Sequence, residues 1–452
     1  MEVKKVLTIA GSDSGGGAGI QADLKTITAL GGFGMSVVTA LTAQNTLGVQ
    51  GIHEVPFEFV EKQFDSVATD IGIDAAKTGM LASSDIMKIV ANKIREYGIS
   101  MLVVDPVMVA KGGAQLIREE AKKTLIEELI PLAFVITPNV PEAEELAGMK
   151  ITHVDDMKEA ARIITSQGAA NVLVKGGHMS GDARDILYDG REFYEFVSKR
   201  YATEDTHGTG CTTSAAIATG LAQGLGVYEA VRRAKDYITT AIRFSFRIGG
   251  GHGPTNHMAY VFRESERYRC IMELKGAVQR LQEARCGNII PEIQSNFAFA
   301  LPYAENSEDV AAIPGRLIRV GEHARTLHDP EFAASSHVAK IVLTVMRYDG
   351  TYRSAIDIKF SDELVSICRE LGYDLDEFSR ANEPEDVKQR EGSSLEWGTN
   401  DVLSRRNTIP DMIFDRGDIG KEPVIRILGR TPTEVAEKVL RISDTLRTRR
   451  EV

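Results

Sequence analysis

The first 260 residues alternate between short apolar runs and longer stretches in which apolar positions recur at helical spacing. The apolar runs are bounded by Gly, Pro or Asp, which predicts buried strands of a parallel sheet. They read KKVLTIA, MSVVTAL, DAAKTGM, SMLVVDPV, AFVITP and ANVLVKG. The helical stretches between them read GIQADLKTITALGG, FEFVEKQFDSVATD, SSDIMKIVANKIREYG and VDDMKEAARIITSQG. Strand–helix alternation of this kind predicts an α/β fold with a mostly parallel sheet covered by helices on both faces.

Two features depart from this alternation. The stretch ARDILYDGREFYEF predicts a β-hairpin that turns at Asp189 and Gly190. After residue 260, FRESERYRCIMELKGAVQRLQEA predicts a charged amphipathic helix, and the remainder mixes helical stretches with strand-like runs such as RLIRV, RSAIDIKF and EPVIRILG. We therefore expect a first domain over residues 1–262, a helical linker over 263–287 and a second, smaller α/β domain over 288–452.

Composition narrows the class of protein. A chain of 452 residues is expected to form two or three domains, and its net charge of −11 argues against nucleic acid as the main partner. The chain has no run of about eighteen apolar residues, so we expect no membrane span. The four cysteines lack the CxxC spacing of zinc sites, and the N-terminal residues lack the apolar region of a secretory signal. These features predict a cytoplasmic protein with reduced thiols.

A glycine-rich loop, AGSDSGGGAGIQADLK, follows the first predicted strand and precedes the first predicted helix. Its spacing fits neither a dinucleotide fingerprint nor a nucleotide P-loop. Ligands of parallel α/β sheets bind beyond the carboxyl ends of the strands, where this loop lies. It is either a ligand loop, with Asp13 and Asp23 as nearby carboxylates, or a tight turn followed by an acidic helix face.

A second glycine-rich stretch, DTHGTGCTTSAAIATG, carries the most specific chemistry. The backbone amides of Gly208, Thr209 and Gly210 at a helix N-terminus are expected to form an anion pocket. Cys211 then lies in the first turn, where the helix dipole is expected to lower the thiol pKa. A buried structural cysteine is the alternative interpretation. A third stretch, RIGGGHGPTNH, is interpreted as a surface turn.

Seven motifs in order over these 260 residues resemble the bifunctional hydroxymethylpyrimidine/phosphomethylpyrimidine kinases of thiamine biosynthesis. They are AGSDSGGGAGIQADLKT, TALTAQNT, KTGML, VVDPVM, TPNVPEAEEL, VLVKGGH and THGTGCTTSAAI. The resemblance implies a ribokinase-like three-layer α/β/α domain. It also implies two successive ATP-dependent phosphorylations, first of the pyrimidine alcohol and then of its monophosphate. The family is commonly dimeric, so a homodimer acting on small molecules is expected.

The resemblance also assigns roles to residues of the phosphate site. Gly208 and Gly210 are expected to hold the transferring phosphoryl group with Thr209, and Cys211 to accept the proton of the alcohol. Many ribokinase-like enzymes place an aspartate at that position. We hypothesise that a thiolate also tolerates the anionic monophosphate, which a fixed carboxylate would repel; a Cys211→Asp variant that keeps the second phosphorylation would contradict this.

Further residues match family positions around the substrates. Lys175 is expected to reach the ATP phosphates, while Asn139 and Glu142 match an Asn-x-x-Glu pattern that organises Mg²⁺ and its waters. A helix N-cap and a solvated first-turn acid are the alternative interpretations of that pair. The residues expected to surround the aminopyrimidine are Gly11, Asp23, Gln44, Met80 and Val107.

The second domain concentrates basic residues in an acidic chain, within PGRLIRVGEHARTLHDPEFAASSHVAK. Ser335 or Ser336 is a suitable N-cap, which places His337 in the first turn of a helix. A cationic side chain there is unfavourable unless an anion binds nearby. With the loop DRGDIGKEP at residues 415–423, this pattern indicates either a site for a phosphate-rich ligand or a solvated surface.

The layout is similar to the archaeal-type thiamine-phosphate synthase domain often fused behind this kinase. The matching segments are PEIQSNFAFALP, PGRLIRVG, FAASSHVAK, EGSSLEWG and DRGDIGKEP. The implied reaction joins the pyrimidine pyrophosphate to thiazole phosphate and releases pyrophosphate. We expect Arg316 and His337 to clamp the leaving group, with Arg416 and Lys421 as further candidates. Two alternatives remain, a non-catalytic thiamine-phosphate sensor in place of the synthase and a pyridoxal-kinase-like vitamin kinase.

Overall fold

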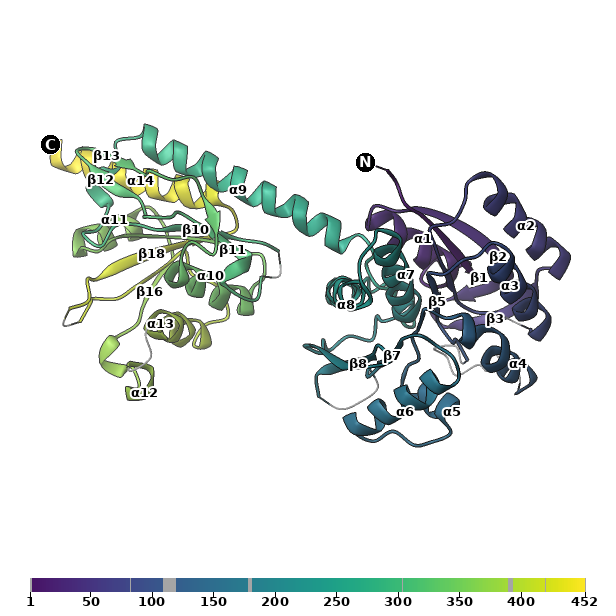
Figure 1. Ribbon diagram of the computed structural model, residues 1–452. Helices are drawn as coiled ribbons and strands as arrows, with labels where there is room; N and C mark the ends of the chain where they lie inside the picture. Colours follow the sequence, from purple (N-terminus) through teal and green to yellow (C-terminus); the bar gives the residue numbers. More distant parts are fainter. Residues whose placement is uncertain are drawn as a thin grey trace. The chain divides into compact units, whose positions relative to one another are not determined.

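A computed structural model describes residues 2–81, 83–108, 119–177, 181–302, 304–388, 393–418 and 420–451 (Figure 1). The chain divides into two compact units, Met1–Val261 and Phe262–Val452. Each unit has its own sheet and its own core.

The first unit is built on a nine-stranded sheet with the order β3-β2-β1-β4-β5-β6-β7-β8-β9. The strands are β1 (Lys5–Asp13), β2 (Phe33–Asn45), β3 (Gly48–Glu54), β4 (Ala75–Thr78), β5 (Leu102–Val104), β6 (Val135–Ile136), β7 (Val172–Lys175), β8 (Ala183–Tyr188) and β9 (Phe193–Ser198). The pairs from β2 to β7 are parallel, whereas β3, β8 and β9 are added antiparallel. The predicted mostly parallel sheet and the hairpin at Asp189–Gly190 are therefore confirmed.

Helices cover both faces of this sheet. They are α1 (Gly19–Ala29), α2 (Phe57–Asp70), α3 (Ser84–Glu96), α4 (Glu119–Thr124), α5 (Val140–Ala147), α6 (Val154–Ser166), α7 (Thr209–Ala222) and α8 (Val227–Arg243), with short turns at Leu125–Leu129 and Ile130–Leu132. Successive strand side chains point to opposite faces, so Leu102 and Val104 pack with α3 and α6, whereas Val103 packs with α7 and α8. This is the expected three-layer α/β/α arrangement.

Helix α7 is buried on all sides from Thr212 to Ala222. Its small residues permit this: a side chain on Gly220 would meet Ala230 of α8 at 3.1 Å. The dense packing fixes the direction of α7 and therefore the position of its N-terminus.

The second unit has a seven-stranded, mostly antiparallel sheet with the order β14-β11-β10-β15-β18-β17-β16. Its strands are β10 (Phe297–Ala300), β11 (Val310–Ala312), β14 (Glu331–Phe332), β15 (Ser354–Lys359), β16 (Leu375–Glu377), β17 (Met412–Phe414) and β18 (Val424–Gly429). The predicted strand RLIRV lies outside this sheet, because β12 (Ile318–Val320) and β13 (His323–Arg325) form a separate ribbon.

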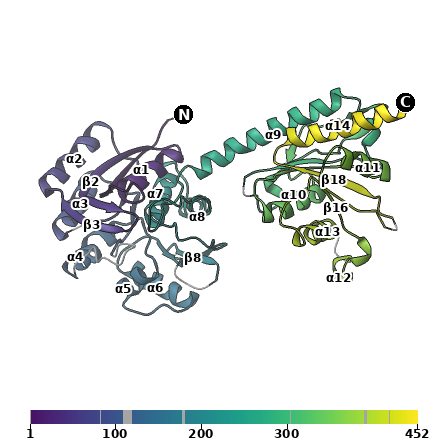
Figure 2. The same cartoon turned by 180° about the vertical axis from the view of Figure 1, so that it is seen from behind.

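Two sets of helices cover the faces of the second sheet (Figures 1 and 2). Helices α9 (Ala259–Glu283), α11 (Asp362–Glu370) and α14 (Pro432–Glu451) lie on one face, and α10 (Ser336–Tyr348) and α13 (Ser393–Ser404) on the other. Short helical segments stand at Gly287–Ile289, Ser307–Asp309, Arg380–Asn382 and, as α12, Glu385–Lys388.

The segment expected to be a linker, residues 263–287, is mostly part of α9. Cys270, Leu274, Val278 and Leu281 of this helix are buried in the core of the second unit. Their spacing of three to four residues forms one apolar face, so this segment is a packed element of that unit along that face.

Candidate active site

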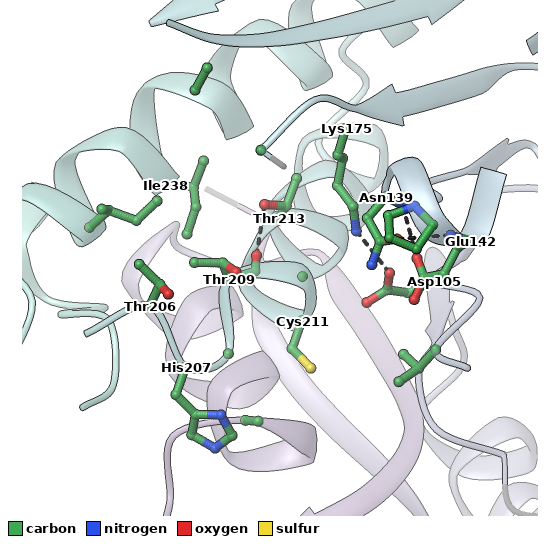
Figure 3. A pocket seen from close by; sticks show the side chains of 18 of the residues that line it. Asp105, Asn139, Glu142, Lys175, Thr206, His207, Thr209, Cys211, Thr213 and Ile238 are labelled. Atoms are coloured by element: carbon green, nitrogen blue, oxygen red, sulfur yellow. Dashed lines mark hydrogen bonds and ion pairs between the residues drawn. The ribbon is translucent and has the colours of Figure 1, made fainter. Parts of the chain in front are cut away.

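A large cavity of about 1170 Å³ opens at the carboxyl ends of the parallel strands of the first unit, beside the N-terminus of α7 (Figure 3). It is lined by most of the site residues expected in the first domain. They are Gly11, Gln44, Met80, Val107, Asn139, Glu142, Lys175, Gly208, Thr209, Gly210 and Cys211. The structure thus brings together residues from all seven motifs, with Asp23 as the exception.

The N-terminus of α7 has the geometry of an anion site. Its N-cap, Gly208, has a φ of +83°, and the first helical hydrogen bond runs from Thr212 N to Gly208 O at 2.9 Å. The preceding N–H groups of Thr209, Gly210 and Cys211 have no acceptor within the helix. A side chain at position 208 would come within 1.8 Å of the carbonyl oxygen of Gly17, so only glycine fits there.

Charged side chains converge opposite this helix end. Lys175 Nζ lies 3.1 Å from Asp105 Oδ1, and Asp105 also accepts a hydrogen bond from Ser214 Oγ at 3.3 Å. The pKa of Lys175 is raised above its usual value. Burial acts to lower it, but the carboxylates of Asp105 and Glu142 together outweigh that effect, so the amine is charged. A side chain at Gly210 would meet Asp105 at 3.4 Å and Lys175 at 3.6 Å, which places the pair directly beside the helix end.

Asn139 and Glu142 form a capping box at the start of α5. Asn139 Oδ1 accepts from Glu142 N, and Glu142 Oε2 accepts from Asn139 N, both at 2.9 Å. The N-cap interpretation is therefore confirmed, and both residues also line the cavity. Burial raises the pKa of Glu142 to about 7, with Lys175 opposing the rise and Asp105 adding to it.

The expected low pKa of Cys211 is wrong. Burial raises the pKa of this thiol from about 9 to about 12, although Lys77 opposes the rise. Asp23 and Asp105 add to it, because a thiolate here would face two carboxylates. With a pKa of about 12, Cys211 is a neutral thiol at pH 7.

Asp23 does not line the cavity. Its side chain is fully buried, 3.1 Å from Lys77 Nζ, and accepts a 2.6 Å hydrogen bond from Thr8. The expected direct contact with substrate is therefore wrong in this structure, because Asp23 is enclosed with Lys77 behind the cavity wall. Lys77 lies close enough to influence the Cys211 thiol. No local pattern in the sequence indicated a role for Lys77, which stands 54 residues from Asp23.

The glycine-rich loop after β1 wraps around the carboxylate of Asp13. That carboxylate accepts from the N–H groups of Gly15, Gly17 and Ala18 at 2.8, 3.0 and 2.8 Å. These amides therefore donate within the loop itself, as the interpretation of the loop as a tight turn predicts. Asp13 also contacts His207 Nε2 at 2.9 Å, and that nitrogen lies 3.2 Å from Gln44 Nε2.

Among the cavity residues without a predicted role are Asp105, His207 and Lys235. Asp105 stands in the motif VVDPVM, within a predicted strand, and His207 stands in THGTGC, directly before the glycine turn. Their positions could therefore have indicated a role. Lys235, on α8, donates to Asp185 Oδ2 at 2.7 Å, and its helix gave no such signal.

A smaller cavity of about 260 Å³ lies in the second unit at the N-terminus of α10. Arg316 and His337, predicted to act together, both line it, with Asn296, Ser335 and Ser336 among the other lining residues. Ser335 is the N-cap of α10, as expected, so His337 lies in the first turn.

The backbone around this small cavity is unusual. Among the residues that the structure describes, the non-glycine residues with positive φ are Gln294, Arg316 and Ala333. Gln294 and Arg316 line the cavity, and Ala333 precedes its lining residue Ala334. Such conformations cost free energy and cluster at functional sites.

Arg416 and Lys421 do not line the small cavity. Arg416 pairs with Asp362 at 3.0 Å and with Glu377 at 3.5 Å, over the ring of Phe360. Lys421 donates to Ser394 at 3.2 Å. Their expected contact with substrate is not supported by this structure, because local carboxylates and hydroxyls hold both side chains elsewhere.

Within the described residues, no helix has the length and apolar character needed to cross a membrane. All four cysteines are free. The described part of the chain also contains no cluster of three or more His, Cys, Asp or Glu side chains suited to a metal ion.

Comparison with known proteins covers both units. Residues 13–256 match the phosphomethylpyrimidine kinase family, and residues 273–441 match thiamine-phosphate synthase ThiN. The chain is 51% identical over 262 residues to the hydroxymethylpyrimidine/phosphomethylpyrimidine kinase of Bacillus subtilis, covering 58% of this chain and 97% of that protein. It is 59% identical over 254 residues to the thiamine biosynthesis bifunctional protein ThiED of Geobacter sulfurreducens, covering 56% of this chain and about half (52%) of that protein.

Solved structures of related kinases are similar in fold to the first unit. The ADP complex of Bacillus subtilis pyridoxal kinase has a TM-score of 0.55 at 43% identity and covers 57% of this chain and 99% of that one. The Staphylococcus aureus pyridoxal kinase with pyridoxal has a TM-score of 0.54 at 39% identity, covering 57% and 95%. With the motifs, the cavity and these matches together, the chain belongs to the phosphomethylpyrimidine kinase family and carries a ThiN-type thiamine-phosphate synthase domain behind the kinase, as a multifunctional transferase of thiamine biosynthesis.

Proposed function

We propose that the first unit phosphorylates 4-amino-5-hydroxymethyl-2-methylpyrimidine and then its monophosphate with ATP, and that the second unit couples the resulting pyrophosphate to thiazole phosphate. The observation that carries the kinase half is that Lys175, Asp105 and Glu142 share one cavity with the end of α7, where the N–H groups of Thr209, Gly210 and Cys211 have no acceptor within the helix. Phosphoryl transfer needs positioning and charge neutralisation more than covalent chemistry, and this arrangement supplies both.

In the first step the substrate hydroxyl oxygen attacks the γ-phosphorus of ATP, a new O–P bond forms and the bond to the leaving ADP oxygen breaks. The N–H groups of α7 hold the transferring phosphoryl oxygens, and Lys175 neutralises their charge. Because Cys211 is a thiol at pH 7, we assign it a positioning role beside the hydroxymethyl group. The hydroxyl proton leaves late, to the phosphoryl oxygens or to water, as a loose transition state permits.

Glu142 fits Mg²⁺ through its carboxyl, which lines the cavity together with Asp105 and whose pKa burial raises to about 7. Mg²⁺ usually takes one or two protein carboxylates and completes its shell with phosphates and water, so a larger protein cluster is not required. When bound, the ion would neutralise phosphate charge. Asn139 holds Glu142 in place through the capping box and orients any water bound there.

In the second unit, Arg316 and His337 line one cavity, which supports their role as a clamp for pyrophosphate. The thiazole nitrogen forms a bond to the pyrimidine methylene carbon as the bond to the pyrophosphate oxygen breaks. Loss of pyrophosphate leaves positive charge on the pyrimidine, and the two cations stabilise the leaving negative charge. Arg416 and Lys421 have no role in this proposal.

We further propose that the protein acts as a cytoplasmic homodimer on these small molecules. The support for a second copy is a group of exposed apolar side chains on β2, β3, the turn between them and α2, namely Leu41, Leu47, Ile52, Phe57 and Phe59. Apolar side chains gathered on one part of a surface are typical of protein contacts.

The function is tested by product analysis with the full chain. With the pyrimidine alcohol and excess Mg·ATP, the pyrimidine pyrophosphate should accumulate with two ADP formed per product. With synthetic pyrimidine pyrophosphate and thiazole phosphate, pyrophosphate should be released, and an Arg316→Ala variant should lose at least about a hundredfold in this rate. Absence of pyrophosphate release from the wild-type chain would instead leave the second unit as a thiamine-phosphate sensor.

A second candidate activity is phosphorylation of pyridoxal, because the solved relatives of the first unit include pyridoxal kinases. Competition between pyridoxal and the pyrimidine alcohol for Mg·ATP distinguishes the two. We expect kcat/KM for the pyrimidine to exceed that for pyridoxal, and the reverse order would favour this second candidate.

A further inference from the structure

A row of polar side chains crosses the second sheet on the face that α10 and α13 cover. Asp357 of β15 stands opposite Arg426 of β18, and its N–H donates to the carbonyl of Asn296 on the other side at 3.3 Å. Asp415 follows β17 directly, two residues after Ile413. Ala355, Leu428 and Ile413, each two residues from a member of this row, belong to the core under α10 and α13. Because strand side chains alternate, the row points to the same face.

The inner part of the row is a buried charge network. Arg426 is 1% exposed and Asp415 is fully buried, and Arg426 Nη2 donates to Asp415 Oδ2 at 2.8 Å. Arg380 Nε donates to the other oxygen of Asp415 at 2.7 Å. Two guanidinium groups thus share one carboxylate. Over the part of the chain that the structure describes, Nε and Nη1 of Arg426 are buried without a hydrogen-bond partner.

Unpartnered guanidinium nitrogens in a buried position are costly, so a negative group nearby is needed to balance them. Asp357 is that group by charge. Burial raises the pKa of its carboxyl, and the positive charges of Arg426, Arg316 and His337 oppose that rise; the last two residues line the small cavity. Yet the carboxyl oxygens of Asp357 form no hydrogen bond or ion pair with the described residues. Asp357 is half-buried, so its oxygens are free to bind a ligand that extends from the cavity.

We propose that Asp357 is a substrate-binding residue of the second site, which accepts a hydrogen bond from the amino group of the aminopyrimidine. The inference rests on the proposed function for the class of ligand. An amino group donates to a carboxylate oxygen, whereas the phosphate end of the ligand is drawn to Arg316 and His337. The charges of the site therefore set the direction in which the ligand binds.

The volume of the small cavity agrees with a ligand that extends beyond it. Its 260 Å³ is below the roughly 300–1,000 Å³ of typical ligand sites, so a ligand held by Arg316 and His337 continues beyond the cavity. A carboxylate beside the pyrimidine also stabilises the positive charge that develops there when pyrophosphate leaves. Asp357 thus serves both binding and the reaction.

The test measures binding to the full chain by calorimetry, with thiamine phosphate and inorganic pyrophosphate as probes. Asp357→Asn should weaken thiamine phosphate at least about tenfold and leave pyrophosphate within about twofold, because the acceptor of the amino group loses its charge and one of its two oxygens becomes an NH₂ donor. Asp411→Asn is the matched control. Asp411 lies at the other end of β17, 2.7 Å from Lys438, and its variant should bind both probes like the wild type. Equal weakening of both probes by Asp357→Asn, or no weakening of thiamine phosphate, would overturn the proposal.

A second measurement uses the unaltered protein, so that folding of a variant is not at issue. Oxythiamine phosphate carries an oxygen in place of the amino group and presents an acceptor to Asp357. The wild-type chain should bind it at least about tenfold more weakly than thiamine phosphate. Equal affinity, or no binding of thiamine phosphate at all, would contradict the proposal. Binding with this selectivity but without pyrophosphate release would contradict the proposed synthase activity alone.

Discussion

Burial acts on Cys211 and Glu142 in the same direction and gives them different chemistry. The pKa of the Cys211 thiol rises to about 12 and that of the Glu142 carboxyl to about 7. At neutral pH the thiol keeps its proton, whereas the carboxyl lies at the midpoint of its titration and loses its proton readily to a bound cation. Cys211 therefore contributes shape and hydrogen bonding, and Glu142 contributes charge.

Replacement of Cys211 by serine tests the role of the thiol. Because a neutral thiol is no proton acceptor, we expect Cys211→Ser to lower kcat for the pyrimidine alcohol by less than about tenfold. The profile of kcat against pH, measured from about pH 6 to about pH 9, should have the same shape as that of the wild type. A loss of about a hundredfold or more, together with the disappearance of a titrating limb, would return Cys211 to the role of general base.

The titration of Glu142 predicts a pH dependence of magnesium binding. Below pH 7 the ion has to displace a proton from this carboxyl, so apparent affinity should rise about tenfold per pH unit and level off above about pH 7. Glu142→Gln should bind Mg²⁺ weakly with no such dependence. Calorimetric titration with Mg²⁺ in the presence of ADP measures both proteins, and a flat wild-type profile would contradict the assignment.

The same shift affects stability in the absence of ligands. The folded-state pKa of Glu142 is raised above its unfolded value of 4.5, so the unfolded state releases the proton more readily. The contribution of Glu142 to the free energy of unfolding therefore falls as pH rises from about 4.5 to about 7 and is constant outside that window.

The ion pair of Asp23 with Lys77 predicts a defect in stability. Asp23→Asn leaves a buried lysine without its carboxylate and should cost about 3–5 kcal/mol of unfolding free energy. The control, Lys5→Met, breaks a pair at 3.9 Å in which both side chains are about one-third exposed, and should cost no more than about 1 kcal/mol. Urea unfolding measures both. An Asp23→Asn protein of normal stability with a raised KM for the pyrimidine would restore Asp23 as a substrate ligand.

Which single residues could be predicted depended on how local their chemistry is. Gly208 and Gly210 are readable from the sequence because a turn and a helix start are encoded by adjacent residues. The burial of Asp23 depends on its ion pair with Lys77, which is 54 residues away, and no local pattern predicts that pairing. The pKa of Cys211 was mispredicted for the same reason, since burial and the charges of Asp23 and Asp105 come from the assembled fold.

At the scale of elements, the start of α7 is the feature on which the first cavity depends. Gly208→Ala would place a methyl group 1.8 Å from Gly17 O in a backbone conformation that disfavours side chains. The turn must move, so we expect kinase activity to fall at least about a hundredfold.

Gly224, just beyond the other end of α7, is the matched control. Its φ of +87° is similar, but a side chain there meets nothing within 4 Å. Gly224→Ala should therefore cost about 1 kcal/mol of stability and leave kinase kinetics unchanged. If the two variants were equally active, the close contact of Gly208 with Gly17 would have no bearing on catalysis.

Elements with strong local patterns were predictable, and those defined by their neighbours were not. The parallel strands and the hairpin of β8 and β9 followed from apolar runs and an Asp-Gly turn. The run RLIRV looks like a sheet strand, yet it pairs with His323–Arg325 in a separate ribbon, because partner choice is a tertiary property. Similarly, the apolar face within 263–287 was read as part of a connector, although it completes the core of the second unit.

At the scale of the whole molecule, two units with separate cores carry two separate cavities. The product proposed for the first cavity is the substrate proposed for the second. The order of motifs along the chain made this arrangement predictable. The polar row from Asn296 to Asp415 instead needed the sheet register, which sets Asp357 opposite Arg426 although the two are far apart in the sequence.

The central claim is that one chain converts the pyrimidine alcohol to thiamine phosphate. The most direct measurement supplies the purified full chain with the alcohol, Mg·ATP and thiazole phosphate and quantifies thiamine phosphate by chromatography. We predict formation of thiamine phosphate by the wild type, accumulation of pyrimidine pyrophosphate by His337→Ala, and no product from Gly208→Ala unless pyrimidine pyrophosphate is added. Accumulation of pyrimidine pyrophosphate by the wild type, without thiamine phosphate, would contradict the account.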